Sequence, residues 1–265
     1  LRRQRQMCIR DRLAIANQKG GVGKTTTSIN LAASLAAMQR EVLLVDLDPQ
    51  GNATTGSGIE KGDSPYSIYD VLIEGLSVEE AMINAEAAGY HLLPANADLS
   101  GADVEFLDIP DWEYCLSKAL APAKARYDYI IIDCPPSLSL LTLTGLVAAD
   151  GVIIPMQCEY YALEGLTALI GTISRITGKL NPNLAIKGIV RTMFDPRNRL
   201  AKEVSNDLIE HFGDIVFHTV IPRNVRLAEA PSYGVPVMYY DKQSRGARGY
   251  LALAGELSKR LEHKD

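Results

Sequence analysis

The ten residues 18-QKGGVGKTTT-27 combine three glycines with two lysines, Lys19 and Lys24, that lie five positions apart. Glycines let backbone N–H groups turn toward an anion, and the N-terminus of a following helix adds a favourable dipole. Such a loop cradles nucleotide phosphates, so we expect Lys24 to meet the β- and γ-phosphates and Thr25 to ligate Mg²⁺. The common form of the loop has glycine at the position of Gln18. This loop is therefore a variant, and one phosphate site does not require Lys19.

The predicted nucleotide-binding residues in the loop are consecutive: Gly20, Gly21, Val22, Gly23, Lys24, Thr25 and Thr26. Lys24 is also a candidate catalytic residue because it can neutralise phosphate charge; the loop alone does not assign a task to Lys19.

Aspartates follow two apolar segments of the chain. Asp46 and Asp48 come at the end of 42-VLLVD-46, and Asp133 ends 129-YIIID-133. Open α/β sheets bind ligands at the carboxyl ends of their strands. A carboxylate after four apolar residues is costly to bury unless it serves a metal shell or accepts strong hydrogen bonds. Asp133 is thus predicted to act on Mg²⁺, through water, although a simple strand-end turn is the alternative.

Short apolar runs alternate with helical patterns along the chain. Expected strands are 13–17, 42–46, 90–94, 129–133, 151–155 and 185–190, and expected helices are 24–38, 68–84, 112–124, 138–149, 161–177, 199–211 and about 246–262. Several strands are apolar on both faces, as in parallel sheets buried between helices. Ser77 with Glu80 predicts a capping box, and Gly178 a helix C-cap. The pattern predicts an α/β fold, a doubly wound and mostly parallel sheet with helices on both faces.

The composition is that of a globular protein, with 265 residues, 47% hydrophobic and 22% charged. The sequence contains no run of about 18 apolar residues, so it predicts no membrane-spanning helix. The four cysteines, Cys8, Cys115, Cys134 and Cys158, are scattered, which disfavours a metal site or a disulfide framework. A reducing, cytosolic environment fits this pattern best.

The charge is distributed unevenly. Residues 13–186 carry 21 acidic and 9 basic side chains, whereas residues 187–248 carry 7 acidic and 10 basic ones. The basic excess predicts a local surface for a polyanion. Residues 1–12 contain five arginines and no helix or strand period. We expect them to be a non-native or disordered basic tail, with a nucleic-acid arm as the alternative, and 13–265 to form a single P-loop ATPase domain.

Three motifs, 19-KGGVGKT-25, 46-DLDPQGNAT-54 and 130-IIIDCPPS-137, resemble those of the ParA/Soj family of deviant Walker A ATPases, which partition plasmids and chromosomes. The similarity continues through 157-QCEYYALEGL-166 and 219-TVIPRNVRLAEAPSYGVPV-237 and covers Leu13 to about Leu261. It is greatest to the short chromosomal members of Soj type.

The resemblance implies a role for Lys19. In the family this signature lysine reaches across an ATP-dependent homodimer to the phosphates of the other subunit. It also implies that Asp48 positions or activates the attacking water and that Asp46 lies on the Mg²⁺ side. Adenine is expected near 222-PRN-224, at Pro222 and Asn224. A cation supplied in trans would stabilise charge at the γ-phosphate as an arginine finger does, which is consistent with phosphoryl-transfer chemistry.

The family also implies partners. Arginines that match Arg197 and Arg226 contact double-stranded DNA without sequence specificity, and a ParB/Spo0J-type centromere-binding protein stimulates hydrolysis. The implied location is cytoplasmic and nucleoid-associated. From charge counts alone, these arginines would be interpreted as solvated or internally paired. The roles of Arg199, Arg245 and Arg248 stay open. Tyr160 and Tyr161 are interpreted as core or interface residues rather than base-stacking ones.

Three other functions are alternatives. A MinD-like membrane-associated ATPase would end in a basic amphipathic helix, but acidic residues offset the cations of 250-YLALAGELSKRLEHKD-265. A metabolic P-loop enzyme would need a separate substrate constellation, and the sequence shows none. An iron–sulfur reductase relative would need suitably placed cysteines.

Overall fold

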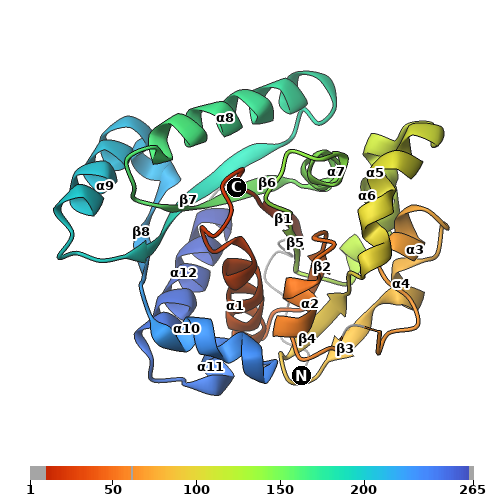
Figure 1. Cartoon of the computed structure of the whole chain (residues 1–265), viewed down its shortest axis with the longest axis horizontal. Helices are drawn as coiled ribbons and strands as arrows, with labels where there is room; N and C mark the ends of the chain where they lie inside the picture. Colours follow the sequence, from red (N-terminus) through yellow and green to blue (C-terminus); the bar gives the residue numbers. More distant parts are fainter. Residues whose placement is uncertain (1–9, 61, 263–265) are drawn as a thin grey trace.

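The computed structural model describes residues 10–60 and 62–262, which form one eight-stranded sheet around which the helices pack (Figure 1). The strands are β1 (Asp11–Ile15), β2 (Val42–Asp46), β3 (Ile83–Ala85), β4 (Tyr90–Leu93), β5 (Tyr129–Asp133), β6 (Gly151–Gln157), β7 (Ala185–Phe194) and β8 (Val216–Pro222). Their order is β3-β4-β2-β5-β1-β6-β7-β8, and only the β3–β4 pair is antiparallel. The predicted fold class, a doubly wound and mostly parallel sheet, is confirmed.

Helices connect the parallel strands. The α-helices are α1 (Lys24–Ala37), α2 (Asn52–Gly56), α3 (Ile68–Leu72), α4 (Val78–Ala81), α5 (Ala102–Glu105), α6 (Cys115–Leu120), α7 (Leu140–Ala148), α8 (Ala162–Lys179), α9 (Arg199–Phe212), α10 (Val225–Glu229), α11 (Val237–Tyr240) and α12 (Arg245–Glu262). Short 3₁₀ turns add η1 (Ala97–Gly101), η2 (Phe106–Asp108), η3 (Trp112–Tyr114), η4 (Ala123–Ala125), η5 (Gly213–Ile215) and η6 (Ala230–Tyr233).

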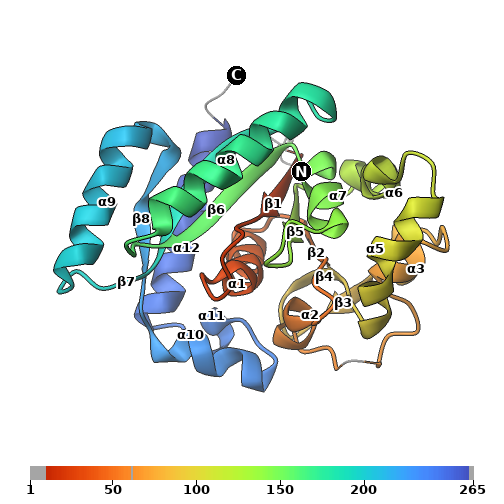
Figure 2. The same cartoon turned by 45° about the horizontal axis from the view of Figure 1, so that its top comes forward.

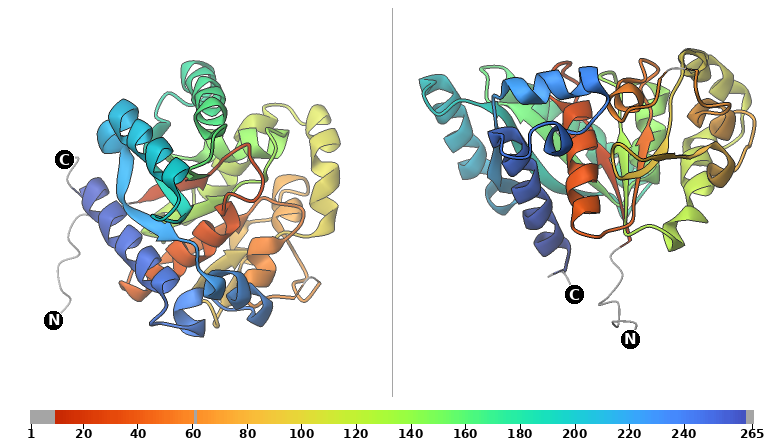
Figure 3. Two further views of the ribbon diagram at one scale, coloured as in Figure 1. Left: turned by 60° about the vertical axis from the view of Figure 1, so that its left-hand side comes forward. Right: turned by 90° about the horizontal axis from the view of Figure 1, so that it is seen from below.

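The two faces of the sheet carry separate hydrophobic cores because successive side chains of a strand point to opposite faces. In β1, Leu13 and Ile15 join the core under α1, α11 and α12, whereas Ala14 joins the core under α6, α7, α8 and α9. Figure 3 shows the helices on either side of the sheet. Since seven strands run parallel, their carboxyl ends share one edge, and that edge carries the candidate site.

The structure corrects several details of the expected elements. The helix expected over 68–84 is instead α3, α4 and the edge strand β3, because Gly75 takes a left-handed φ of 74° and Ser77 starts a new helix there. The Ser77–Glu80 capping box is confirmed. Gly178 lies inside α8 rather than at its cap. The pattern also missed β8, whose buried and exposed residues do not alternate regularly.

The expected boundary at residue 12 is wrong for Asp11 and Arg12, which begin β1. The Arg12 guanidinium donates to Asp150 Oδ1 at 2.9 Å and Oδ2 at 3.2 Å, and its backbone N–H donates to the same carboxylate at 3.0 Å. A carboxylate at the start of the neighbouring strand therefore fixes this arginine. Residues 1–9 of the predicted tail lie outside the described residues.

In the described ranges, no helix is both long and apolar enough to cross a membrane.

Candidate nucleotide site

The glycine-rich loop joins the end of β1 to the start of α1 at the carboxyl edge of the sheet (Figure 2). Gly21 and Gly23 have φ values of 73° and 88°, which only glycine adopts without strain. Asn17 fixes the entry, since its side chain donates to Pro155 O at 2.7 Å and accepts from Lys19 N at 3.0 Å. Backbone conformation and anchoring contacts together preform a phosphate cradle.

A hydrogen bond from β7 fixes the second half of the loop. Thr192 Oγ1 donates to Val22 O at 2.7 Å, so the end of β7 is tied directly to the phosphate loop.

Lys24 lies at the first position of α1 and is 7% exposed. Its ammonium donates to Lys19 O at 3.1 Å, across the mouth of the loop. Burial lowers the pKa of Lys24, while Asp133, Cys134 and Asp48 oppose that shift. A buried cation with one backbone partner is suited to exchange that partner for phosphate oxygens.

Lys19 is placed differently. Its ammonium forms an ion pair with Glu159, at the end of β6, and the two side chains are 52% and 53% exposed. The Lys19 side chain is therefore half-exposed and paired with an acidic residue outside the loop.

Asp133 is fully buried at the end of β5, level with Ile15 of β1 and Asp46 of β2. Ser28 donates to its Oδ1 at 2.7 Å, but its Oδ2 is buried and has no hydrogen-bond partner in the described chain. Burial, reinforced by the nearby Asp46, raises the pKa of Asp133 from 3.8 to about 8, against the hydroxyl groups of Ser28 and Thr25, which lie close enough to lower it. The fold thus holds a carboxylate whose charge needs a cation.

Asp46 is also fully buried, but both its oxygens are occupied. Oδ1 accepts from Asp48 N at 3.1 Å, and Oδ2 accepts from Thr54 N and Thr54 Oγ1, each at 2.8 Å. Burial raises the pKa of Asp46 to about 6, against these three hydrogen bonds. In this structure Asp46 organises the loop that carries Asp48, and its predicted place on the metal side stays a prediction.

Asp48 follows on that loop and is 8% exposed. Its Oδ1 accepts from Gln50 N at 3.0 Å. Asp48 also opposes the burial shift of Lys24, so the carboxylate and the ammonium act on the same region.

The donor set fits Mg²⁺. The orphaned Asp133 Oδ2, the carboxylate of Asp48 and the Thr25 hydroxyl at the start of α1 are all oxygen ligands of the kind that Mg²⁺ prefers, directly or through water. Across the described ranges, no cluster of three or more His, Cys, Asp or Glu forms an all-protein metal cage. That agrees with a cation held mainly by phosphates and water.

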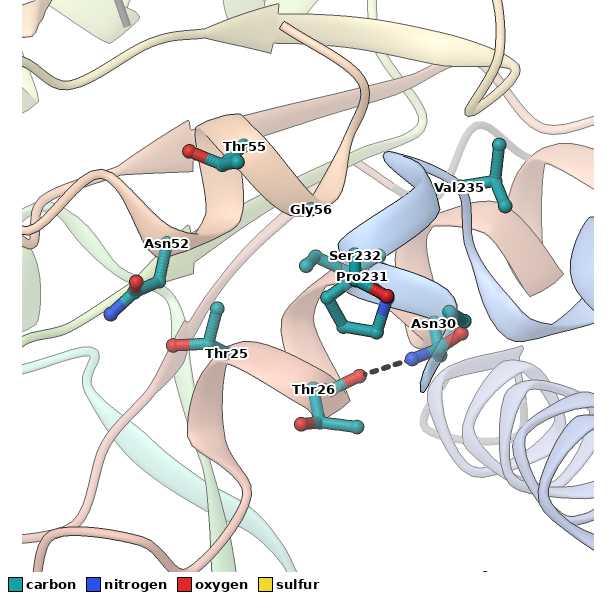
Figure 4. A pocket seen from close by; sticks show the side chains of 11 residues that line it. Thr25, Thr26, Asn30, Asn52, Thr55, Gly56, Pro231, Ser232 and Val235 are labelled. Atoms are coloured by element: carbon teal, nitrogen blue, oxygen red, sulfur yellow. Dashed lines mark hydrogen bonds between the residues drawn. The ribbon is translucent and has the colours of Figure 1, made fainter. Parts of the chain in front are cut away.

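A cavity of about 420 Å³ opens beside the loop, between α1, α2 and residues 230–235 (Figure 4). Thr25 and Thr26 form one end of it, and Asn52 and Ser232 contribute polar groups to other walls. The predicted base-binding residues, Pro222 and Asn224, do not line it.

Pro222 and Asn224 instead lie at the carboxyl end of β8, on the same edge of the sheet as the phosphate loop. Asn224 Oδ1 is buried with no partner among the described atoms. A buried amide oxygen of this kind could accept from an exocyclic amine. The base site stays a prediction, and this oxygen supports it.

The predicted DNA-contacting arginines both have acidic neighbours. Arg197 donates to Asp195 at 2.8 Å, and Arg226 donates to Glu229 at 2.8 Å and lies 3.4 Å from Asp241. Arg197 lowers the pKa of Asp195 to about 2. The internal ion pairs expected from charge counts are therefore present. The side chains nevertheless remain exposed, 89% for Arg197 and 49% for Arg226.

Sequence reasoning missed several residues of this edge. Asn17, Ser28, Thr54 and Thr192 position the loop and the carboxylates. Thr54 ends the motif 46-DLDPQGNAT-54, but its contact with Asp46 was not predicted, and the other three residues lie outside the motifs. Arg223, an exposed arginine between Pro222 and Asn224, was also passed over. Tyr160 and Tyr161 are each 73% exposed, so core packing is wrong for them and an interface remains.

Residues 11–186 match the protein family described as "AAA domain". The chain is 51% identical over 250 residues to the chromosome partitioning protein ParA of Caulobacter vibrioides, covering 94% of each chain. It is 51% identical over 246 residues to the sporulation initiation inhibitor protein Soj of Bacillus subtilis, covering 93% of this chain and 97% of Soj.

Among solved structures, the fold is similar to cobyrinic acid a,c-diamide synthase from Mycobacterium smegmatis with bound ADP and magnesium. The TM-score is 0.84 and the identity 38%, over 96% of both chains. A neighbour that holds ADP and magnesium agrees with the predicted cofactors, ATP and Mg²⁺.

Proposed function

The chain belongs to the ParA/Soj family of chromosome-partitioning ATPases, as its motifs predict, and we propose that it is an ATP-switched dimer that binds DNA without sequence specificity. In this proposal the ATP state drives partitioning of a chromosome or plasmid in the cytoplasm, at the nucleoid. A ParB/Spo0J-type protein stimulates hydrolysis and resets the switch.

The observation that carries the proposal is the shared edge of the sheet. Arg197 follows β7 and Arg226 follows β8, and the phosphate loop follows β1 at the same edge. Arg245, at the start of α12, also acts electrostatically on Asp195 and so lies near Arg197. A nucleotide that orders this edge can thereby control a basic surface beside it.

Dimerisation is supported by Lys19 and its surroundings. Its side chain is half-exposed and paired with Glu159, and Tyr160 and Tyr161, which follow Glu159, expose an edge-to-face aromatic pair. Exposed aromatic side chains beside a catalytic edge are suited to a protein interface. If a second subunit docked there, Lys19 would leave Glu159 and pair with the γ-phosphate bound to that second subunit.

Within one site, each residue has a distinct task. Lys24 neutralises the β- and γ-phosphates, and Thr25 with Asp133 holds the Mg²⁺ shell. Asp48 orients the attacking water, because hydrolysis requires mainly positioning and charge neutralisation. Asp46 and Thr54 keep the Asp48 loop in place through their hydrogen bonds.

The alternatives fare less well. A MinD-like membrane helix is disfavoured because the apolar side chains of α12, including Tyr250, Leu253 and Leu257, are buried in the core beside α1. A metabolic enzyme is disfavoured because identity to the partitioning relatives, at 51%, exceeds the 38% to the synthase.

The test is binding to random-sequence duplex DNA in ATP or ADP, with Asp48→Ala to hold the ATP state and a chain that starts at Arg10. We expect ATP-dependent binding that weakens with salt. Arg226→Ala should lower the slope of log K against log salt by about 2 for a dimer, one phosphate per subunit. Arg197→Ala should lower the slope in the same way. Arg175 is an exposed arginine on α8, and Arg175→Ala should leave both the affinity and the slope unchanged.

DNA binding that is equal in ATP and ADP, or unaffected by both arginine variants, would contradict the proposal. If a dimer forms in ATP but binds no DNA, the ATP-dependent switch would stand and DNA would be rejected as its target.

A further inference from the structure

The helix α5 lies at the opposite end of the molecule from α9 (Figures 1 and 2), and with η2 it carries an apolar patch of two exposed side chains. Val104 is 71% exposed and Leu107 is 72% exposed. They are three residues apart on a continuous helical stretch, so both side chains lie on one side of it. Large apolar side chains held in water at a helical spacing mark an interaction site.

The patch is firmly supported from below. Phe106, between the two exposed residues, is fully buried and stacks on Trp112 with ring centroids 5.5 Å apart. Val104 and Leu107 are therefore presented by a packed element, so docking there would require little ordering of the chain.

The rim of the patch is acidic. Between Lys61 and Lys118 the sequence has twelve acidic residues and no lysine or arginine. Asp98, Asp108 and Asp111 are exposed around the helical stretch. In the part of the chain that the structure describes, no carboxylate of 62–117 pairs with Lys or Arg; Asp98 and Glu105, for example, accept only from Asn96 and Tyr69. This charge is therefore free to attract a cationic partner.

We propose that Val104 and Leu107, with Asp98, Asp108 and Asp111 around them, form a docking surface for a segment of the ParB-type partner that is both cationic and apolar. The inference rests on the proposed function, which supplies such a partner. DNA and anionic membranes are excluded as occupants by the charge. A second copy of the patch is disfavoured because it carries the same charge.

An indirect route links α5, which carries part of the patch, to the nucleotide site. Asp103, on α5, accepts a hydrogen bond from Leu141 N at 3.3 Å, in the first turn of α7. The loop that precedes α7 follows directly on Asp133. A segment docked on α5 thus lies one helix away from the carboxylate that we place on the Mg²⁺ shell, which gives docking a route to hydrolysis.

The experiment measures ATP hydrolysis by the full chain with duplex DNA and increasing amounts of the ParB-type partner. The double variant Val104→Ser/Leu107→Ser should need about tenfold more partner for half-maximal stimulation, with an unchanged basal rate. Ile209→Ser, at a side chain 46% exposed on α9, is the matched control and should behave like the unaltered protein. Asp108→Asn/Asp111→Asn should weaken the salt dependence of stimulation.

Equal stimulation of the double variant and the unaltered protein would overturn the docking site while leaving the proposed function intact. Failure of the partner to stimulate the unaltered protein would overturn both. A change in self-association of the double variant without partner, measured by sedimentation, would assign the patch to a second copy of the chain and overturn the proposed occupant.

Discussion

The Asp133→Asn substitution should remove a pH dependence of stability that the buried carboxylate creates. The pKa of Asp133 is raised from 3.8 to about 8, first by burial and then by Asp46. Between these two values the folded chain holds a proton that the unfolded chain has lost. The free energy of unfolding therefore falls as pH rises through this window, because the folded state binds more protons.

The size of the effect follows from the linkage relation. One proton of difference changes the free energy of unfolding by about 1.4 kcal/mol per pH unit. With a folded pKa of about 8, Asp133 is mostly protonated from pH 6.5 to 7.5. It should therefore account for a loss of about 1 kcal/mol over this interval. Asp46, with a pKa of about 6, is largely ionised there and adds little.

Urea unfolding at pH 6.5 and 7.5, without nucleotide or Mg²⁺, measures this difference. Asp133→Asn should lose the Asp133 part of the slope, and its ATP hydrolysis should fall. Asp150→Asn is the matched control: burial raises the pKa of Asp150, but Arg12 and Lys124 outweigh that effect and hold it below the usual value. That carboxylate is ionised in both states, so the control should lose stability and keep the slope. Identical slopes for Asp133→Asn and the unaltered protein would refute the reasoning.

Three further changes test other parts of the site. Gly20→Val should keep nucleotide binding and monomer stability within about 0.5 kcal/mol, since no atom lies within 4 Å of its added Cβ, but should block the dimer; a concentration-dependent dimer in ATP would contradict this. Thr54→Val should lower the free energy of unfolding, measured in urea, by about 2–4 kcal/mol, because Asp46 loses a hydrogen-bond donor and Ala95 N loses an acceptor. Thr54→Ser keeps the hydroxyl and should lower it by only about 1 kcal/mol. Equal losses for the two variants would reject the role of the hydroxyl. Glu159→Gln should tighten the ATP dimer about two- to tenfold in sedimentation by freeing Lys19, with no change in ADP, and a weaker dimer would count against that role.

The sequence predicted the sheet best where a strand is buried on both faces. The segments 42–46 and 129–133 have the observed bounds, because continuous apolar runs between turn residues leave little choice. Prediction failed at 68–84, where local chemistry at Gly75 and Ser77 divides a pattern that has a helical period. It also failed at β3 and β8, the two edge strands, which are buried less regularly and so lack a clear pattern.

The candidate site follows the same logic. Residue type and spacing predicted the phosphate loop, Asp48 and Asp133, because each combines an unusual residue with a strand end. Spacing could not show that Lys19 pairs with Glu159, which is 140 positions away, or that Thr192 ties β7 to Val22. Such contacts depend on tertiary packing between distant segments, which residue spacing does not encode.

The unpaired atoms connect the fold to its function. Among the described residues, the buried side-chain atoms without a hydrogen-bond partner include Asp133 Oδ2 and Asn224 Oδ1. One lies where the metal and the γ-phosphate are expected, and the other lies where the base is expected. Each costs the ligand-free protein about 1–3 kcal/mol, a cost that a bound nucleotide with Mg²⁺ would relieve. A nucleotide that satisfies both atoms should therefore stabilise the chain more than a ligand that satisfies only one of them.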